Sequence, residues 1–216
     1  MATVLSPPEQ KVILQYVSWE TYVRLLADHK DRSSPRFTYD HGMLEIMSPS
    51  TEHERLNRRL ATIVEIVAEE LHSEFDNVGS TTFTRADLLR GFEPDSCFYL
   101  QNVERILDKA QIDLETDPPP DLIIEIDITH PSLDKFPIYA QVGVGEIWRY
   151  DGSRFAIFRL EQARYVEQHT STVLPGLTGA AIADFLEASK RLKRTVWVQH
   201  VREWVRGQGA AGNEVH

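Results

Sequence analysis

Hydrophobic residues recur at helical spacing in several segments of the chain. The longest such segment spans residues 48–75 and carries one apolar stripe, formed by Leu56, Leu60, Ile63, Val67 and Leu71. Shorter segments with the same spacing predict helices over 18–26, 133–144, 177–189 and 195–205. Ser18 is a suitable N-cap for the first of these.

Apolar and polar residues alternate instead in a second group of segments, which is typical of β-strands. Residues 36–48 predict a hairpin that turns at Asp40-His41-Gly42, and residues 145–160 predict another that turns at Asp151-Gly152-Ser153. Further strands are expected over 80–89, 94–100, 121–129 and 164–170. Helices interspersed with strands, one of them a crossover helix, predict an α/β fold with a mixed sheet.

The segment DLIIEIDIT, residues 121–129, contains two carboxylates in an otherwise apolar strand. Alternation places Ile124, Ile126 and Ile128 on one face and Glu125 and Asp127 together on the other. Unpaired carboxylates on a partly buried face repel and raise each other's pKa. Either this face is solvated, or the two acids share a cation.

A third acid, Asp95, begins the strand predicted over 94–100. Together with Glu125 and Asp127 at one sheet edge, it would form an oxygen-rich site suited to Mg²⁺ or Mn²⁺. Such an ion lowers the pKa of bound water and polarises a phosphoryl oxygen. Lys135, near the beginning of the helix over 133–144, either adds a hydrogen-bond donor to this site or lies on the surface. These residues favour metal-dependent hydrolysis.

Composition limits the alternatives. The chain has 216 residues, of which 42% are hydrophobic, and its net charge is −10. No apolar run reaches the length of a membrane span, and no signal peptide is recognised, so we expect a cytoplasmic protein. The acidic charge argues against a broad phosphate-binding surface but allows a local basic patch. Cys97, the single cysteine, is interpreted as a small buried hydrophobe rather than a nucleophile.

Six segments occur in an order that is specific in combination: YDHGMLEIMSPSTEHE, STTF, EPDSCFYLQN, DPPPDLIIEIDIT, LDKFPIYAQVGVGEIWRYDG and LPGL. Together they resemble the Uma-two family of restriction-endonuclease-like proteins over about residues 18–186. The resemblance implies a PD-(D/E)xK core, in which helices flank a mixed sheet and acids at one edge bind Mg²⁺. We therefore expect a restriction-endonuclease-like domain over 1–189, with its core at about 18–186. Residues 190–216 would then form a C-terminal helical extension and a disordered tail.

Position by position, the resemblance implies that Asp95 and Glu125 bind the metal. It also implies that the family's lysine has moved from the strand to the following helix, where Lys135 matches it. Asp127 occupies the usual lysine position, and we expect it to serve as a further metal ligand that assists catalysis. If the lysine had not moved, the chain would lack its base equivalent and would be inactive.

The beginning of the long helix is expected to join the same site. His53 points along the apolar stripe toward the sheet, where it is either a satisfied core histidine or a residue that orients a carboxylate or a water. Glu54 is the expected acidic contribution of this helix, although Glu52 is an alternative. Glu54 also fits a capping box with Thr51.

The sequence thus predicts a Mg²⁺- or Mn²⁺-dependent endonuclease acting on nucleic acid, with DNA as the expected substrate. Two alternatives remain: an inactive module of the same fold that binds nucleic acid or a protein, and a hydrolase of another phosphoester. Arg55, Arg58 and Arg59 either contact phosphates or form a solvated helix face, and the solvated interpretation is favoured for SKRLKR at 189–194. Trp197 and Trp204 fit internal packing or a homodimer contact.

Overall fold

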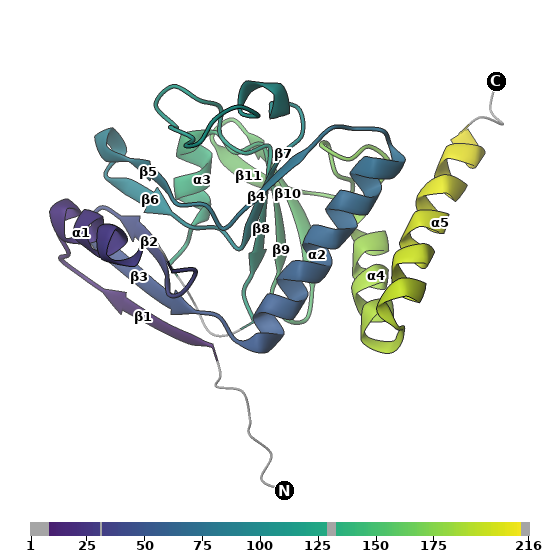
Figure 1. Ribbon diagram of the computed structural model, residues 1–216, viewed down its shortest axis with the longest axis horizontal. Coiled ribbons are helices and arrows are strands. Elements are labelled where there is room, and N and C mark those ends of the chain that lie inside the picture. The colour runs from purple at the N-terminus through teal and green to yellow at the C-terminus, as the bar shows by residue number, and fades with distance from the viewer. Residues whose placement is uncertain (1–8, 31, 129–132, 213–216) are drawn as a thin grey trace, which may run out of the picture.

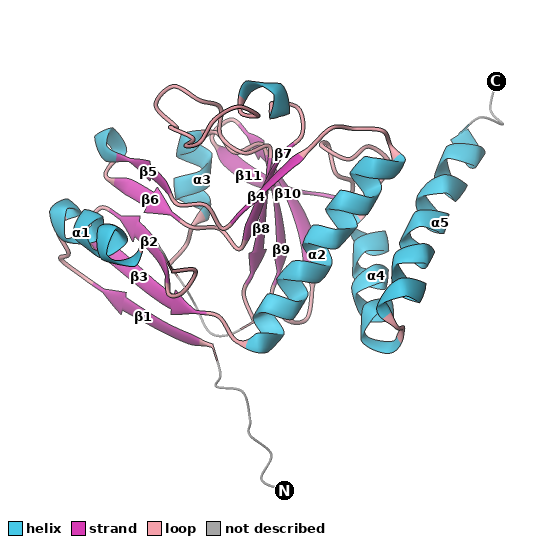
Figure 2. Cartoon of the chain, viewed as in Figure 1, coloured by secondary structure: helices cyan, strands magenta, loops and turns pink. Residues whose placement is uncertain are grey.

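Two β-sheets and five α-helices form the part of the chain that the computed structural model describes, residues 9–30, 32–128 and 133–212 (Figure 1). Helices and strands are interspersed along the chain, which confirms the predicted mixed α/β fold (Figure 2). No helix in these ranges is both long enough and apolar enough to cross a membrane.

The smaller sheet is antiparallel, with the order β1-β3-β2-β6-β5. Its strands are β1 (Gln10–Leu14), β2 (Arg36–Asp40), β3 (Met43–Ser48), β5 (Phe83–Arg85) and β6 (Arg90–Phe92). The hairpin of β2 and β3 confirms the turn predicted after Asp40. Helix α1 (Trp19–His29) is capped by Ser18 and covers this sheet, where Tyr22 stacks on Tyr39 with 4.9 Å between ring centroids.

The larger sheet has the order β11-β10-β9-β8-β7-β4. Its strands are β4 (Asp76–Gly79), β7 (Ser96–Tyr99), β8 (Leu122–Ile126), β9 (Glu146–Tyr150), β10 (Phe155–Glu161) and β11 (Arg164–Gln168). Only β8 and β9 pair in parallel among the described strands, and helix α3 (Phe136–Val142) connects them as the predicted crossover. Two short 3₁₀ helices, η1 (Ala86–Leu88) and η2 (Val103–Arg105), lie in the connections.

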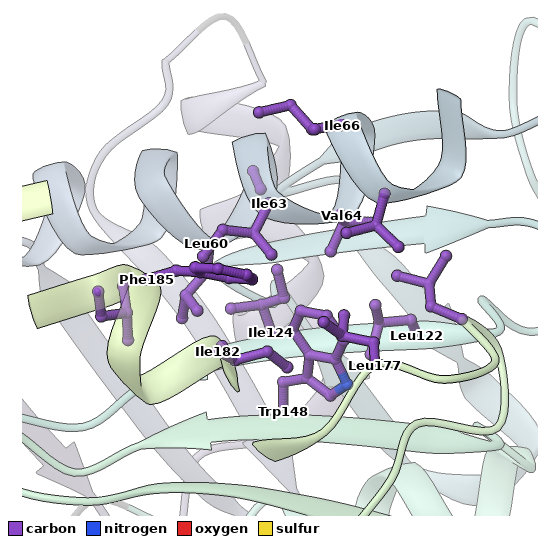
Figure 3. Close-up of a cluster of buried hydrophobic side chains, with 14 of the residues drawn as sticks. Leu60, Ile63, Val64, Ile66, Leu122, Ile124, Trp148, Leu177, Ile182 and Phe185 are labelled. Carbon is purple, nitrogen blue, oxygen red and sulfur yellow. The ribbon is translucent and has the colours of Figure 1, made fainter. Parts of the chain in front are cut away.

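The main core lies between the larger sheet and the helices α2 (Thr51–Glu70), α4 (Gly179–Arg191) and α5 (Arg194–Gly212). Figure 3 shows the side chain of Leu60 on α2 in the cluster with Ile124 of β8 and Trp148 of β9, all of them fully buried. Ile126 belongs to this core and Ile128 packs against it, so the predicted apolar face of β8 is confirmed. The opposite face of β8 is left for Glu125.

Helix α5 extends the core at the C-terminal side. Trp197 and Val201 are buried there, and Trp204 packs against Phe185 with 5.4 Å between ring centroids. The tryptophan stripe therefore packs within the chain. Helix α5 continues to Gly212, and residues 213–216, the end of the expected tail, lie outside the described ranges. The domain division after residue 189 stays a prediction.

Candidate functional site

Asp95 lies directly before β7 and connects four elements through its hydrogen bonds. Its side chain is almost fully buried, and Oδ2 accepts the backbone N–H of Ile126 in β8 at 2.7 Å. Oδ1 is 2.7 Å from Nε2 of His53 and also accepts a hydrogen bond from Arg36 of β2. The amide of Asn57 on α2 donates to the backbone carbonyl of Asp95 at 2.8 Å. Burial opposes ionisation, but His53 and then Arg36 lower the pKa of Asp95 to about 2.

His53 is the buried partner that holds Asp95 on its inner side. Its backbone N–H donates to Ser50, which caps α2 in place of the predicted box of Thr51 and Glu54. The ring is fully buried, with Nδ1 2.6 Å from Oε2 of Glu9. Burial by itself lowers the pKa of His53, but Asp95 and Glu9 raise it to about 9, so both ring nitrogens donate at neutral pH. The predicted contact between His53 and a carboxylate is therefore present, with Glu9 as an unpredicted partner.

Of the two acids considered at the beginning of α2, Glu54 is the one connected to Asp95. Arg36 donates from Nη2 to Glu54 and from Nη1 to Asp95, so a single guanidinium joins the two carboxylates. Glu52 is exposed and forms no ion pair with any residue in the described ranges. Glu54 reaches the site only through Arg36.

Glu125 lies on β8, on the face opposite the isoleucines, and is 7% exposed. Its Oε2 accepts a hydrogen bond from Nζ of Lys135 at 2.8 Å, and its Oε1 accepts one from the hydroxyl of Tyr139 on α3. Burial raises the pKa of Glu125, and Asp95 raises it further against the opposing effect of Lys135. Lys135 thus reaches back to the strand end, as the sequence predicts.

Lys135 also lies within the electrostatic field of other acids. Burial by itself lowers the pKa of its ammonium group, but Glu125, Asp95 and Glu45 raise it well above the ordinary value. The three residues expected to carry the chemistry, Asp95, Glu125 and Lys135, are therefore brought together.

Asp127 follows the last residue of β8 and is held by two cations. Its Oδ1 accepts from Nζ of Lys11 at 3.0 Å, and its Oδ2 accepts from Nη2 of Arg149 at 2.7 Å. No group of three histidine, cysteine or acidic side chains suited to a metal ion occurs among the described residues. Asp95, Glu125 and Asp127 therefore do not form one such group among the described residues, and the role of Asp127 as a metal ligand stays a prediction.

A pocket of about 330 Å³ opens beside these residues at the end of β8. Its charged lining residues are Lys11, Glu125, Asp127, Asp134, Lys135 and Arg149. Three cations and three carboxylates thus line a space large enough for a phosphate group. No local sequence pattern marks Lys11 or Arg149 as part of the site, and Arg149 comes to it because β9 places it opposite Glu125 in the parallel register.

Cys97 has no part in this site. Its side chain is fully buried, its thiol donates to the carbonyl of Gly79 at 3.2 Å, and burial raises its pKa. The interpretation of Cys97 as a small core residue is confirmed.

Comparisons with known proteins agree with the fold and with the resemblance. A family model described as "Uma2: Putative restriction endonuclease" matches residues 19–187. The chain is also similar to a crystal structure described as a putative nuclease belonging to DUF820 from Anabaena variabilis ATCC 29413. That likeness has a TM-score of 0.54 at 14% sequence identity, and it covers 79% of this chain and 99% of the other. None of the curated proteins matches. At this identity the structural likeness concerns the fold alone, and it fits the expected restriction-endonuclease-like architecture.

Proposed function

The chain belongs to the Uma2 family of restriction-endonuclease-like proteins, and we propose that it is a metal-dependent endonuclease that hydrolyses phosphodiester bonds in nucleic acid, with DNA as substrate. One observation carries the proposal. Lys135 donates to Glu125 at 2.8 Å, and Asp95, from a distant part of the sequence, accepts the backbone N–H of the neighbouring Ile126, so the three side chains gather beside a pocket lined by further cations.

The donor atoms of this cluster fit Mg²⁺ or Mn²⁺. Mg²⁺ commonly keeps several waters and takes only one or two carboxylates from the protein, so Asp95 and Glu125 suffice without a third acid. Oδ2 of Asp95 accepts one backbone N–H and retains a lone pair, and Glu125 lines the pocket directly. A bound ion would lower the pKa of a water and offset negative charge on the phosphoryl group.

The remaining side chains position the reacting groups. Arg36 and His53 fix the orientation of Asp95. The ammonium group of Lys135 lies beside Glu125, where it can donate to the attacking water or to a phosphoryl oxygen as negative charge develops.

Asp127 has a different role in this proposal from that of a third ligand. It holds Lys11 and Arg149 at the pocket, where both cations can bind the phosphate next to the bond that is cut. A metal ion then needs only the two carboxylates named above.

The second candidate is an inactive module of the same fold that binds nucleic acid. Arg36 and His53 already neutralise Asp95, and Lys135 neutralises Glu125, so the carboxylates are stable without a metal ion. Calorimetric titration with Mg²⁺ and Mn²⁺ separates the two candidates. DNA binding without metal affinity favours the inactive module.

Cleavage of supercoiled plasmid with and without Mg²⁺ tests the endonuclease. We expect Asp95→Asn and Glu125→Gln to reduce the cleavage rate by more than about 100-fold, because even outer-shell partners of metal sites typically contribute about 10- to 100-fold. Glu104→Gln, an exposed carboxylate on η2, is the matched control and should cleave normally. Unchanged cleavage by both site variants contradicts the assignment, and small phosphodiesters tested in parallel would identify a different phosphoester substrate.

A further inference from the structure

A second pocket, of about 520 Å³, lies between α2 and the turn from α4 to α5. Three arginines of α2 line it, Arg55, Arg58 and Arg59, and Arg194 adds a fourth from the beginning of α5. The whole chain has a net charge of −10, so four arginines around one pocket are a local reversal of the overall charge.

The charges of these arginines are largely unneutralised by the protein. Arg55, Arg58 and Arg194 are exposed, and their side chains form no ion pair or hydrogen bond within the described residues. Glu54, an acidic residue at the pocket, is already paired with Arg36. Like charges held close together repel, and a bound anion would remove that repulsion.

The remaining arginine of the pocket, Arg59, is held in place by a hydrogen bond. It donates from Nη2 to the carbonyl of Ser189 at the end of α4, with a distance of 3.1 Å. Burial lowers its pKa, and the charge of neighbouring Arg55 lowers it further. Because this guanidinium is already held in place, it loses less conformational entropy when an anion binds.

The backbone and the pocket floor complete a site for a phosphate. Thr51 in the first turn of α2 lines the pocket, so the positive end of a 20-residue helix dipole lies beside the arginines. Trp197, which is 2% exposed, and Leu192 supply the apolar part of the lining. The packing of α5 against α2 is what brings Arg194 to the three arginines.

Arg36 connects this pocket with the candidate active site. One of its nitrogens binds Asp95, and the other binds Glu54 at the arginine pocket. Figure 1 shows the beginning of α2 and the turn between α4 and α5 at the same lower edge of the molecule. Because Arg36 contacts both Asp95 and Glu54, a nucleic acid strand held at the first pocket can continue toward the arginine pocket.

We propose that the arginine pocket binds backbone phosphate of a nucleic acid strand, away from the bond that is cut. The inference rests on the proposed function in one respect, that both take nucleic acid as the ligand. Arginine is suited to this role because its planar guanidinium donates two parallel hydrogen bonds to phosphate oxygens.

Binding of a fluorescent DNA duplex, followed by anisotropy in EDTA from 50 to 200 mM KCl, tests this inference without requiring cleavage. The variant is Arg58→Gln with Arg194→Gln. The matched control is Arg24→Gln with Arg164→Gln, which removes two exposed arginines from α1 and β11. Each lost phosphate contact reduces the slope of log affinity against log salt by about 0.9, so we expect the slope of the pocket variant to fall by about 1 to 2. The control slope should stay unchanged.

Equal affinities and slopes for the two variants would overturn the inference. Binding of phosphatidylserine vesicles that depends on Arg58 and Arg194, with DNA binding like that of the control, would overturn it in favour of a lipid phosphate. If no metal supports plasmid cleavage while DNA binding still depends on these arginines, the endonuclease proposal fails and this inference stands.

Discussion

Replacing Lys135 by methionine should reveal how strongly the acids of the candidate site depend on one cation. The ammonium group lies 2.8 Å from Oε2 of Glu125, and both side chains are about 10% exposed. At an effective dielectric constant of about 20, the attraction over that distance is about 6 kcal/mol. Desolvation of the two charges offsets part of this energy, and breaking a comparable buried pair costs about 3–5 kcal/mol. We therefore expect Lys135→Met to lower the free energy of unfolding by about 3 kcal/mol at pH 7.

Urea denaturation at 25 °C, evaluated by linear extrapolation, measures this loss. Lys193→Met is the matched control, since Lys193 is exposed and its side chain forms no ion pair within the described residues, so its loss should cost less than about 0.5 kcal/mol. The double variant Lys135→Met with Glu125→Gln removes both charges and should regain most of the lost stability. If Lys135→Met is as stable as the control, the ammonium group does not neutralise the acidic cluster and the electrostatic reasoning is refuted.

The stability of Lys135→Met should also depend on pH, and the direction of that dependence follows from the pKa of Glu125. Burial and Asp95 raise the pKa of Glu125 in the folded state, and removal of Lys135 raises it further. A carboxyl group with a raised folded pKa favours the folded state when it is protonated, and this contribution is lost as the pH rises through that pKa. The stability deficit of Lys135→Met should therefore be smaller at pH 5 than at pH 8.

Three further measurements test the packing and the ion pairs. The fold raises the pKa of His53 from 6.5 to about 9, so the protonated ring contributes its full stabilisation below pH 6.5 and loses it between pH 6.5 and 9. The urea midpoint should therefore fall over this pH range, and His53→Gln should not show that fall. Ile124→Ala should lower the free energy of unfolding by about 2–5 kcal/mol in urea, and Ile13→Ala, at a site that is 42% exposed, by less than about 1 kcal/mol. A Cβ added at Gly91 would clash with the hydroxyl oxygen of Tyr22, so Gly91→Ala should lower the free energy of unfolding by about 1–3 kcal/mol in thermal denaturation, and adding Tyr22→Phe should recover part of this loss.

Local patterns were sufficient to predict the elements that carry their own periodicity. The alternation of Ile124 and Ile126 with Glu125 gave the two faces of β8 correctly, because a strand's faces follow directly from its sequence. The contact between Lys135 and Glu125 was also predictable, because Lys135 follows Glu125 by only ten residues and stands at the beginning of the helix that follows the strand.

Contacts between distant segments could not be predicted in the same way. Strand β1 is largely exposed and pairs with the distant β3, so its own residues show no apolar alternation that would predict a strand. The contact of the neighbouring Glu9 with His53 has no local sequence pattern either. Arg36 stands in an ordinary hairpin strand, and only the folded chain places it between Asp95 and Glu54. Asp127 shares the sequence spacing of a metal ligand, but its partners come from β1 and β9.

Anomalous scattering from crystals soaked in Mn²⁺ tests the proposed metal site most directly. We expect one strong peak within coordination distance of the carboxylates of Asp95 and Glu125, beside Lys135, and no such peak in crystals of Glu125→Gln. Crystals without a peak at these carboxylates, or with a peak bound by Asp127 and neither of the other two acids, would contradict it.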